Sequence, residues 1–556
     1  MIQGKTLRDA IISGANNIST QKIAVDELNV FPVPDGDTGT NMSMTINAAA
    51  RELALLPDNT PIGEVAGTAA SALLRGARGN SGVILSLLFR GFSKALKGKT
   101  EADGADIAEA LSKGVAAAYK AVMKPTEGTI LTVAREAGEK AVEVSAQNKN
   151  EVEIFELICQ QANETLNRTP EMLPVLKKAG VVDAGGKGFC VIFEGMLSVI
   201  RDGKMIPAPD QRTAAAQPSG NAAGNMSRNA AGQVDEEITF TYCTEFIVLK
   251  QPEIQANSVK LRAYLESIGD CVVVVDDESI IKVHVHTDNP GKAISGGLKN
   301  GMLTNIKIEN MRLQHEDQKA SVAAQAAKEK YVPVDESVKY GFVSVCAGDG
   351  VAQLFTDLGV NAIVSGGQTM NPSTDDILHA IHSVPAKTVI VLPNNKNIIM
   401  AAEQAINLAD RRVIVLPTKT IPQGLAAMFA FNEMTTPEEN QREMCRAAER
   451  VGTGQLTFAA RDSEYDGYQI KKDEILALEN GKVAFVEKDL VKAGVKLIRN
   501  LVKKDSSFVT IITGADATEA QANQIVEAVR PKLGQEIDIT VVDGGQPVYY
   551  FIIYVE

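Results

Sequence analysis

The chain has no tryptophan, few other aromatic residues, no long apolar run and no cluster of basic residues. Aromatic residues make up 5% of the 556 positions, so the composition indicates no obvious aromatic-lined pocket. A membrane-spanning helix needs about 20 consecutive, mostly apolar residues, and the sequence therefore predicts no membrane span. Residues 1–5 also lack the charged and apolar regions of a signal peptide, so we expect a cytoplasmic protein.

Charge and cysteine usage argue against two further classes. The net charge is −13 and the Lys and Arg residues are scattered, whereas a broad nucleic-acid surface needs clustered basic residues. We therefore expect no nucleic-acid partner. The six cysteines are widely spaced, which argues against a disulfide framework and predicts that most of them are small core residues.

The length and the patterning predict several domains, because one hydrophobic core rarely serves so long a chain. Residues 1–205 show Ala- and Leu-rich helical patterns broken by glycine loops, which predicts an all-helical domain. Residues 236–317 show the order β-α-β-β-α-β of a ferredoxin-like α+β domain. Residues 337–556 alternate strands with helices, which predicts a parallel α/β sheet followed by a second α/β unit. The polar segments 206–235 and 318–336 are predicted linkers.

The most informative segment is residues 29–41, Asn-Val-Phe-Pro-Val-Pro-Asp-Gly-Asp-Thr-Gly-Thr-Asn. Asp35 and Asp37 lie one residue apart on a glycine-containing turn, and paired carboxylates of this kind suit a hard cation such as Mg²⁺. A predicted helix start follows, where backbone N–H groups and the helix macrodipole favour phosphate; its polar residues are Thr38, Thr40 and Asn41. The alternative is a surface turn without a ligand, since the same residues favour turns for local reasons.

Three further glycine-containing loops lie between predicted helices, at residues 75–82 (RGARGNSG), 124–129 (KPTEGT) and 182–188 (VDAGGKG). Small residues at a helix start let backbone N–H groups approach a phosphate or ribose, and Arg78 could add positive charge. Glycine and threonine are also ordinary capping residues, so each loop alone is weak support. Together in one helical domain, the loops predict nucleotide binding.

The predicted middle domain contains a second candidate site. His284 and His286 are two apart on a predicted strand, so they share one face, and the first strand of the ferredoxin-like order could place Cys243 beside them. A Cys and two His could bind Zn²⁺ with an open fourth position, or could act as nucleophile, acid and base. Asp288, in the next turn, could point to the same place. The alternative is a polar strand face without a ligand.

Two loops of the C-terminal part, residues 365–372 and 393–397, each follow a predicted strand and precede a predicted helix. Open α/β sheets usually hold their ligands at such positions. The same residues also form ordinary turns, and the sequence leaves both interpretations open.

Taken together, the motifs resemble a known kinase family. N-V-F-P-V-P-D-G-D-T-G-T-N-M, R-G-A-R-G-N-S-G, K-P-T-E-G-T-I and V-D-A-G-G-K-G are similar to the ATP-binding subunit of the dihydroxyacetone kinases. That family is a barrel of helices that holds ATP through two magnesium ions bound by aspartates. Over essentially the whole chain, including H-V-H-T-D-N-P-G and G-G-Q-P-V-Y-Y-F, the sequence more specifically resembles the large ATP-binding component of the bacterial fatty acid kinases.

This resemblance implies roles for individual residues. Asp35 and Asp37 would bind magnesium, with Asn29 near the place where the dihydroxyacetone kinases have a third acidic ligand. The residues implied to line the nucleotide are Thr38, Thr40, Asn41, Ser81, Gly82, Thr129 and Asp183. The middle domain would help to transfer phosphate, with His284, His286 and Cys243 as its catalytic residues. The C-terminal domain resembles the DegV-like fold of fatty-acid-binding proteins, which implies docking to such a partner.

We therefore expect an ATP-dependent kinase that phosphorylates the carboxylate of a fatty acid, giving an acyl phosphate for phospholipid synthesis. A separate DegV-like fatty-acid-binding protein would present the substrate. The expected cofactors are ATP and two Mg²⁺ ions, with Zn²⁺ if the group of Cys243, His284 and His286 binds a metal instead of acting directly. The expected assembly is a homodimer. Two alternatives remain open, a dihydroxyacetone-type polyol kinase and a non-enzymatic, ATP-responsive regulatory scaffold.

Overall fold

The computed structural model describes residues 1–29, 36–122, 125–209, 240–251, 254, 256–276, 280–310, 331–368, 370–460, 462–465, 468–533 and 537–556. Contacts divide the chain into two compact units, one formed by residues 1–217 and 331–556 and the other by residues 218–330. Most of the predicted linkers 206–235 and 318–336 lies outside the described residues. Within the described part, no helix combines the length and the apolarity needed to cross a bilayer.

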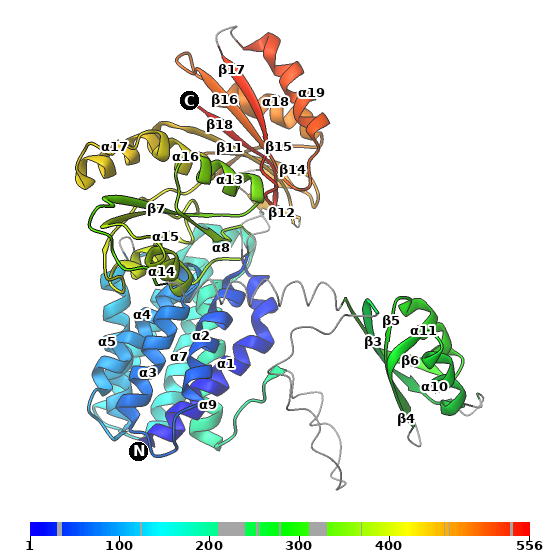
Figure 1. The fold of residues 1–556 in the computed structure, drawn as a ribbon. Coiled ribbons are helices and arrows are strands. Elements are labelled where there is room, and N and C mark those ends of the chain that lie inside the picture. The colour runs from blue at the N-terminus through cyan, green and yellow to red at the C-terminus, as the bar shows by residue number, and fades with distance from the viewer. Residues whose placement is uncertain are drawn as a thin grey trace. The chain divides into compact units, whose positions relative to one another are not determined.

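The first part of the larger unit is almost entirely helical, in agreement with the sequence prediction (Figure 1). Its helices are α1 (Gly4–Asp26), α2 (Thr38–Leu53), α3 (Ile62–Gly76), α4 (Gly79–Leu96), α5 (Gly104–Ala121), α6 (Ile130–Ser145), α7 (Glu151–Met172), α8 (Pro174–Ala179) and α9 (Ala184–Asp202). Two short strands, β1 (Ile2–Gln3) and β2 (Glu101–Ala102), pair antiparallel. Apolar helix faces pack against one another, α1 mainly on α9 and α4 mainly on α5. Cys159 and Cys190 are buried and unbonded, as expected for core cysteines.

The smaller unit has the predicted element order β-α-β-β-α-β. Its elements are β3 (Tyr242–Leu249), α10 (Ser258–Glu266), β4 (Gly269–Asp276), β5 (Ile280–Thr287), α11 (Pro290–Leu298) and β6 (Met302–Asn310). The strand order is β4-β5-β3-β6, and every neighbouring pair is antiparallel. Val283 and Val285 of β5 are fully buried with Phe246 of β3, while the alternate positions of β5 form the more exposed face.

The α/β part of the larger unit begins with the predicted parallel sheet. Its strands are β7 (Tyr340–Cys346), β8 (Ala362–Ser365), β9 (Thr388–Leu392) and β10 (Arg412–Val415), in the order β10-β9-β7-β8. All neighbouring strands are parallel, which confirms the prediction. The helices are α13 (Asp349–Asp357), α14 (Thr374–His382), α15 (Ile399–Ile406), α16 (Ile421–Phe429) and α17 (Pro437–Arg450).

A six-stranded mixed sheet follows, in the order β15-β14-β11-β18-β16-β17. Its elements are β11 (Gly452–Phe458), β14 (Ile475–Glu479), β15 (Lys482–Glu487), α18 (Leu490–Leu501), β16 (Phe508–Thr513), α19 (Glu519–Val529), β17 (Asp538–Asp543) and β18 (Tyr549–Val555), with a separate hairpin of β12 (Ser463–Tyr465) and β13 (Tyr468–Ile470). The sequence analysis predicted a second α/β unit here but did not identify β11, β14 or β15. These three strands extend the sheet beyond β18.

The helical and α/β parts of the larger unit share one hydrophobic core, which joins buried residues of the helices with those of β7, β9, α14 and α15. Helix α14 contacts α3, and α15 contacts α4. Between α3 and α4, Arg78 forms an antiparallel bridge with Ser373, and the Thr374 N–H donates to the Ala77 carbonyl (3.1 Å). The loop before α4 is therefore fixed by the α/β part.

Candidate functional site

A cavity of about 370 Å³ brings most of the predicted nucleotide and magnesium residues together. The predicted residues that line it are Asn29, Asp37, Thr38, Asn41, Ser81, Thr129 and Asp183. The sequence analysis did not select four other polar lining residues, which are Asn80, Thr126, Lys396 and Asn397. Asp35 lies outside the described residues. The volume is in the range of pockets that bind small ligands.

Four helices begin at this cavity. Helix α2 begins at Thr38, α4 at Gly79, α6 at Ile130 and α9 at Ala184, and residues at all four starts line the cavity. Each start carries the positive end of a helix macrodipole, so together they favour an anionic ligand. Neither α4 nor α6 has a side chain that caps its first turn. Their starts are therefore the best candidates for donating backbone N–H groups to phosphate oxygens.

The start of α2 is held by a carboxylate that the sequence analysis did not select. The Asp26 carboxylate, at the end of α1, accepts hydrogen bonds from the N–H groups of Gly39 (2.6 Å) and Thr40 (3.1 Å). It also accepts from the Thr40 hydroxyl (2.7 Å), and Thr40 does not line the cavity. Asp26 therefore already satisfies these donors. Thr38 and Asn41 are the residues of this turn that line the cavity, and the Thr38 hydroxyl donates to Asn29 Oδ1 (2.8 Å).

The Asp37 carboxylate receives a hydrogen bond from the distant α/β part of the chain. Asn371 Nδ2 donates to Asp37 Oδ2 over 2.6 Å. The sequence analysis had no signal for this contact, because the two residues are 334 positions apart. The α/β part therefore contacts one of the two predicted magnesium ligands directly.

Residues 79–82 are closely packed, and Asn80 and Ser81 of this segment line the cavity. Gly79 has φ +57, and a Cβ there would lie 2.5 Å from Asn41 Nδ2, so both the backbone conformation and the space require glycine. Asn80 Oδ1 is buried and has no hydrogen-bond partner among the described residues. An unpartnered oxygen in a cavity wall fits a cation or a donor of a bound ligand. Gly82, predicted to line the nucleotide, instead packs against Thr45, whose hydroxyl leaves no room for a Cβ at position 82.

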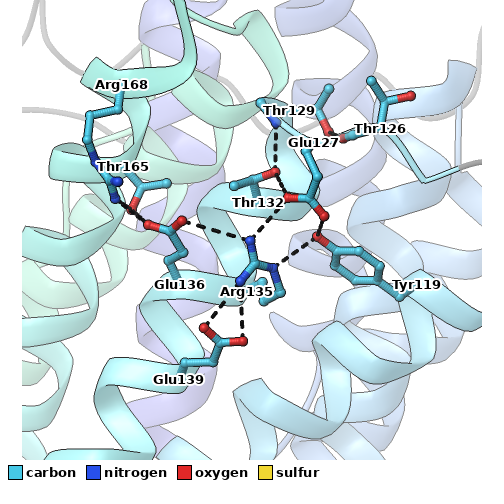
Figure 2. Close-up of polar contacts among 11 residues, drawn as sticks. Tyr119, Thr126, Glu127, Thr129, Thr132, Arg135, Glu136, Glu139, Thr165 and Arg168 are labelled. Atoms are coloured by element: carbon cyan, nitrogen blue, oxygen red, sulfur yellow. Dashed lines mark hydrogen bonds and ion pairs between the residues drawn. The ribbon is translucent and has the colours of Figure 1, made fainter. Parts of the chain in front are cut away.

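Below residues 126–129, an ion-pair network fixes the turn before α6 (Figure 2). Glu127 accepts from the Thr132 hydroxyl (2.7 Å) and from Tyr119 Oη (3.0 Å), and it pairs with Arg135 (3.1 Å). The Thr132 hydroxyl bond, followed by Arg135 and Tyr119, holds the pKa of Glu127 below its usual range. Thr126 and Thr129, which line the cavity, are thus carried on a turn that this network holds in place.

Asp183 is the buried acid of the site. Its carboxylate caps α9 by accepting from the Gly186 N–H (2.7 Å). Burial raises the pKa of Asp183 to about 6, although the N–H groups of Gly186 and Ile130 favour the charged form. A carboxyl group so placed holds the helix start and keeps a proton more readily than an exposed acid.

Arg78 does not contribute charge to the cavity in the way that the sequence suggested. It does not line the cavity; its Nη1 donates to the Asn371 carbonyl (2.7 Å), and its Nη2 lies 3.3 Å from Asp376 Oδ2. Burial lowers the pKa of Arg78, and Asp376 opposes this effect. Arg78 therefore serves the contact between the helical and α/β parts.

In the smaller unit, the two histidines lie together on the more exposed face of β5. Their Nε2 atoms are 3.2 Å apart, and His286 Nδ1 lies 3.5 Å from Asp270 Oδ1. Burial and, next, the neighbouring His284 lower the pKa of His286. Strand register pairs Cys243 with His286, but the Cys243 side chain is outside the described part of the structure. Asp288 accepts from the Thr241 N–H (2.8 Å).

The described side chains of both units contain no cluster of three or more His, Cys, Asp or Glu residues suited to a metal ion. Asp35 and the side chain of Cys243 are not among them. The magnesium and zinc assignments therefore remain predictions.

Family models match three successive parts of the chain. The DAK2 domain matches residues 32–198, the middle domain of the FakA-like fatty acid kinase family matches residues 239–318, and the C-terminal domain of the same FakA-like family matches residues 341–556. Protein YloV of Bacillus subtilis (strain 168) is 42% identical over all of this chain and 99% of its own length. An uncharacterized protein of Staphylococcus aureus (strain USA300) is 40% identical, also over all of this chain and 99% of its own length.

Two kinds of solved structure are similar to parts of the chain. The DegV family protein Cg2579 from Corynebacterium glutamicum has 15% identity and a TM-score of 0.32, covering 40% of this chain and 97% of its own. The dihydroxyacetone kinase from C. freundii in complex with AMP-PNP and Mg²⁺ has 20% identity and a TM-score of 0.28, covering 34% of this chain and 33% of its own.

Proposed function

Because the chain belongs to the FakA-like family of fatty acid kinase components, we propose that it transfers the γ-phosphoryl group of ATP to the carboxylate of a fatty acid. An oxygen of the carboxylate forms the new bond to phosphorus, the bond between the β- and γ-phosphates breaks, and the products are acyl phosphate and ADP. The DAK2 domain match supports ATP chemistry in the helical part.

The observation that carries this proposal is the meeting of four helix starts at one cavity with Asp37 and Asn29. Phosphoryl transfer depends mainly on positioning and on stabilising the charge of the phosphates. The helix starts supply partial positive charge without any movement of side chains. The hydroxyl of Ser81 supplies a further donor at the cavity wall, whereas the Thr129 hydroxyl donates to the Thr126 carbonyl (2.7 Å).

The donor set also fits magnesium, which prefers oxygen ligands. Asp37, Asn29 and the unpartnered Asn80 Oδ1 lie at the cavity, and Asp35 is two positions from Asp37 in the sequence. When bound, magnesium would neutralise and orient the triphosphate. In this proposal Asp35 and Asp37 hold two ions, and Asn29 provides a neutral oxygen.

The smaller unit, which we assign to the ferredoxin-like class, is proposed to act in transfer to the acyl group. Support comes from its element order and from the two adjacent imidazoles, side chains that can act as general acid or base. With the thiol of Cys243 they would also suit Zn²⁺, which takes nitrogen and sulfur ligands. We assign the catalytic roles to His284, His286 and Cys243.

We further propose that a separate fatty-acid-binding protein of the DegV type presents the substrate to the C-terminal domain. The matching families describe one component of a fatty acid kinase, which supports the presence of another component. A carrier would keep the acyl chain out of water while presenting only its carboxylate. We expect the chain itself to form a homodimer, which sedimentation analysis would test.

The test is ADP release from magnesium-ATP in three parallel reactions, which contain the fatty-acid-loaded carrier, the empty carrier or dihydroxyacetone. Turnover only with the loaded carrier is the expected result, together with an acyl phosphate trapped by hydroxylamine. Asp37→Ala should abolish turnover, because it removes a cation ligand. Asp103→Ala, a helix cap away from the cavity, is the matched control.

A polyol kinase is the second candidate, because the DAK2 domain match alone fits it equally well. Turnover with dihydroxyacetone and none with the loaded carrier would favour that activity. ATP binding without turnover in any of the reactions would favour a regulatory scaffold.

A further inference from the structure

The charged side chains that line the cavity include more acids than cations, although a nucleotide is itself anionic. Among the described lining residues they are Asp37, Asp183 and Lys396. Within this described set, the helical domain contributes only acids, while the cation comes from the α/β domain. Arg78, the cation that the sequence suggested, is engaged with Asn371 and Asp376. A triphosphate is strongly anionic, so the position of Lys396 matters for binding.

The loop that carries Lys396 is held firmly. It follows β9 at the carboxyl end of a parallel strand, where α/β sheets usually hold ligands. Asn394 is buried, with φ +55; its Nδ2 donates to Ser344 Oγ (3.0 Å) and to the Val345 carbonyl (3.1 Å). Its N–H donates to Thr418 Oγ1 (3.1 Å). These bonds fix the backbone two residues before Lys396.

The same domain is anchored to the helical domain beside the cavity. Arg78 donates to the Asn371 carbonyl (2.7 Å), and the side chain of Asn371 donates to Asp37 (2.6 Å). Lys396 and its neighbour Asn397 complete another part of the wall. From the α/β domain, Lys396 and Asn397 thus line the nucleotide cavity, and Asn371 contacts its lining residue Asp37.

We propose that Lys396 contacts the phosphates of bound ATP, so that the C-terminal domain supplies a catalytic cation to the kinase site. This inference rests on the proposed ATP site but adds a residue and a domain to it. The ammonium group would stabilise the charge on the phosphate oxygens both in the ground state and as the γ-phosphoryl group is transferred. The C-terminal domain then has two tasks, partner docking and completion of the active site.

The test is equilibrium binding by calorimetry of magnesium-ATP, magnesium-ADP and adenosine to the full-length protein and to Lys396→Ala. Loss of one charge-assisted hydrogen bond should weaken ATP binding by about 10- to 100-fold. ADP binding should weaken no more than ATP binding, and adenosine binding should be unchanged. Lys396→Arg, which keeps the charge, should bind ATP more tightly than Lys396→Ala.

Lys419→Ala and Lys482→Ala are matched controls. These lysines line a second cavity of about 270 Å³ in the α/β domain, which Lys396 also lines, but they do not line the nucleotide cavity. Both variants should bind ATP as the unmodified protein does. If all three lysine variants weakened ATP binding equally, a general effect of charge would replace the proposed contact.

Unchanged ATP affinity in Lys396→Ala would overturn the inference while leaving the proposed function intact. Equal weakening of ATP and adenosine would also overturn it, because a phosphate contact cannot affect a ligand without phosphate. Failure of the unmodified protein to bind ATP would instead refute the proposed function itself. ATP binding by the unmodified protein therefore distinguishes failure of this inference from failure of the proposed function.

Discussion

Asp183 allows a quantitative test of the buried site. Burial raises the pKa of its carboxyl from an ordinary 3.8 to about 6. Each pKa unit corresponds to about 1.4 kcal/mol. Once ionised, the carboxyl therefore lowers the free energy of unfolding by about 3 kcal/mol. The change to make is Asp183→Asn, because an Asn Oδ1 can still accept the Gly186 N–H that caps α9.

The sign follows from the direction of the pKa change. Between about pH 4 and about pH 6 the carboxyl ionises in the unfolded chain while it stays protonated in the folded protein, so this group lowers stability as pH rises. Below about pH 4 it is protonated in both states, and above about pH 6 it is ionised in both. Asp183→Asn removes this loss. Its free energy of unfolding should match the unmodified protein near pH 4 and exceed it by about 3 kcal/mol at pH 7.

The assay is urea denaturation followed by circular dichroism at 222 nm, because the chain has no tryptophan to report by fluorescence. The two proteins are compared at each pH from 4 to 8, without nucleotide and with a chelator present. The difference between them isolates Asp183 from the other carboxyl groups.

Asp103→Asn is the control, because Asp103 also caps a helix by accepting from the backbone N–H three residues on. The same pH dependence in this variant would assign the effect to capping instead of burial. A constant difference between Asp183→Asn and the unmodified protein from pH 4 to pH 8 would refute the reasoning, since no pH-dependent cost of ionisation would then exist.

Three further changes test other parts of the molecule. Arg78→Ala removes a partly buried ion pair with Asp376, which keeps its hydrogen bonds from Ser373, and should cost about 1–3 kcal/mol, seen as faster hydrogen exchange in residues 370–376, whereas Arg75→Ala, at a more exposed ion pair, should cost about 1 kcal/mol or less. Gly79→Ala should cost about 1–3 kcal/mol and weaken ATP binding because it crowds a lining asparagine; Gly98→Ala, also at positive φ but in open space, should leave ATP affinity unchanged. His286→Ala should abolish phosphoryl transfer while calorimetry shows normal ATP binding, and loss of both would indicate misfolding instead.

The sequence predicted those site residues that belong to local motifs. Thr38, Ser81, Thr129 and Asp183 each lie at or beside the start of a helix, and such starts are visible as glycine-containing loops before apolar periodicity. Their occurrence together in one helical domain already predicted a shared nucleotide site, and the resemblance to a kinase family assigned the individual residues to it. Lys396 could be placed on a loop after a strand, but no local pattern connects it with residues more than 200 positions away.

The failure to predict strand β11 from the sequence also has a physical explanation. β11 lies inside the six-stranded sheet, and Thr453, Gln455 and Thr457 on it are buried polar residues. The other face carries Gly452, Gly454, Leu456 and Phe458, so only two apolar residues alternate with the polar ones, which is too short a pattern to mark a strand. Arg78 illustrates a different limit of sequence analysis. A basic residue in a loop that resembles a phosphate-binding loop can instead form a contact between domains.

The hydrogen bond from Asn371 to Asp37 has a thermodynamic consequence for regulation. A protein that binds the α/β domain and moves Asn371 would change the affinity of the cavity for its ligand by some factor. Linkage then requires the cavity's ligand to change the affinity for that protein by the same factor. A carrier that docks more tightly to the ATP-bound form would thereby be released more readily once the nucleotide has left.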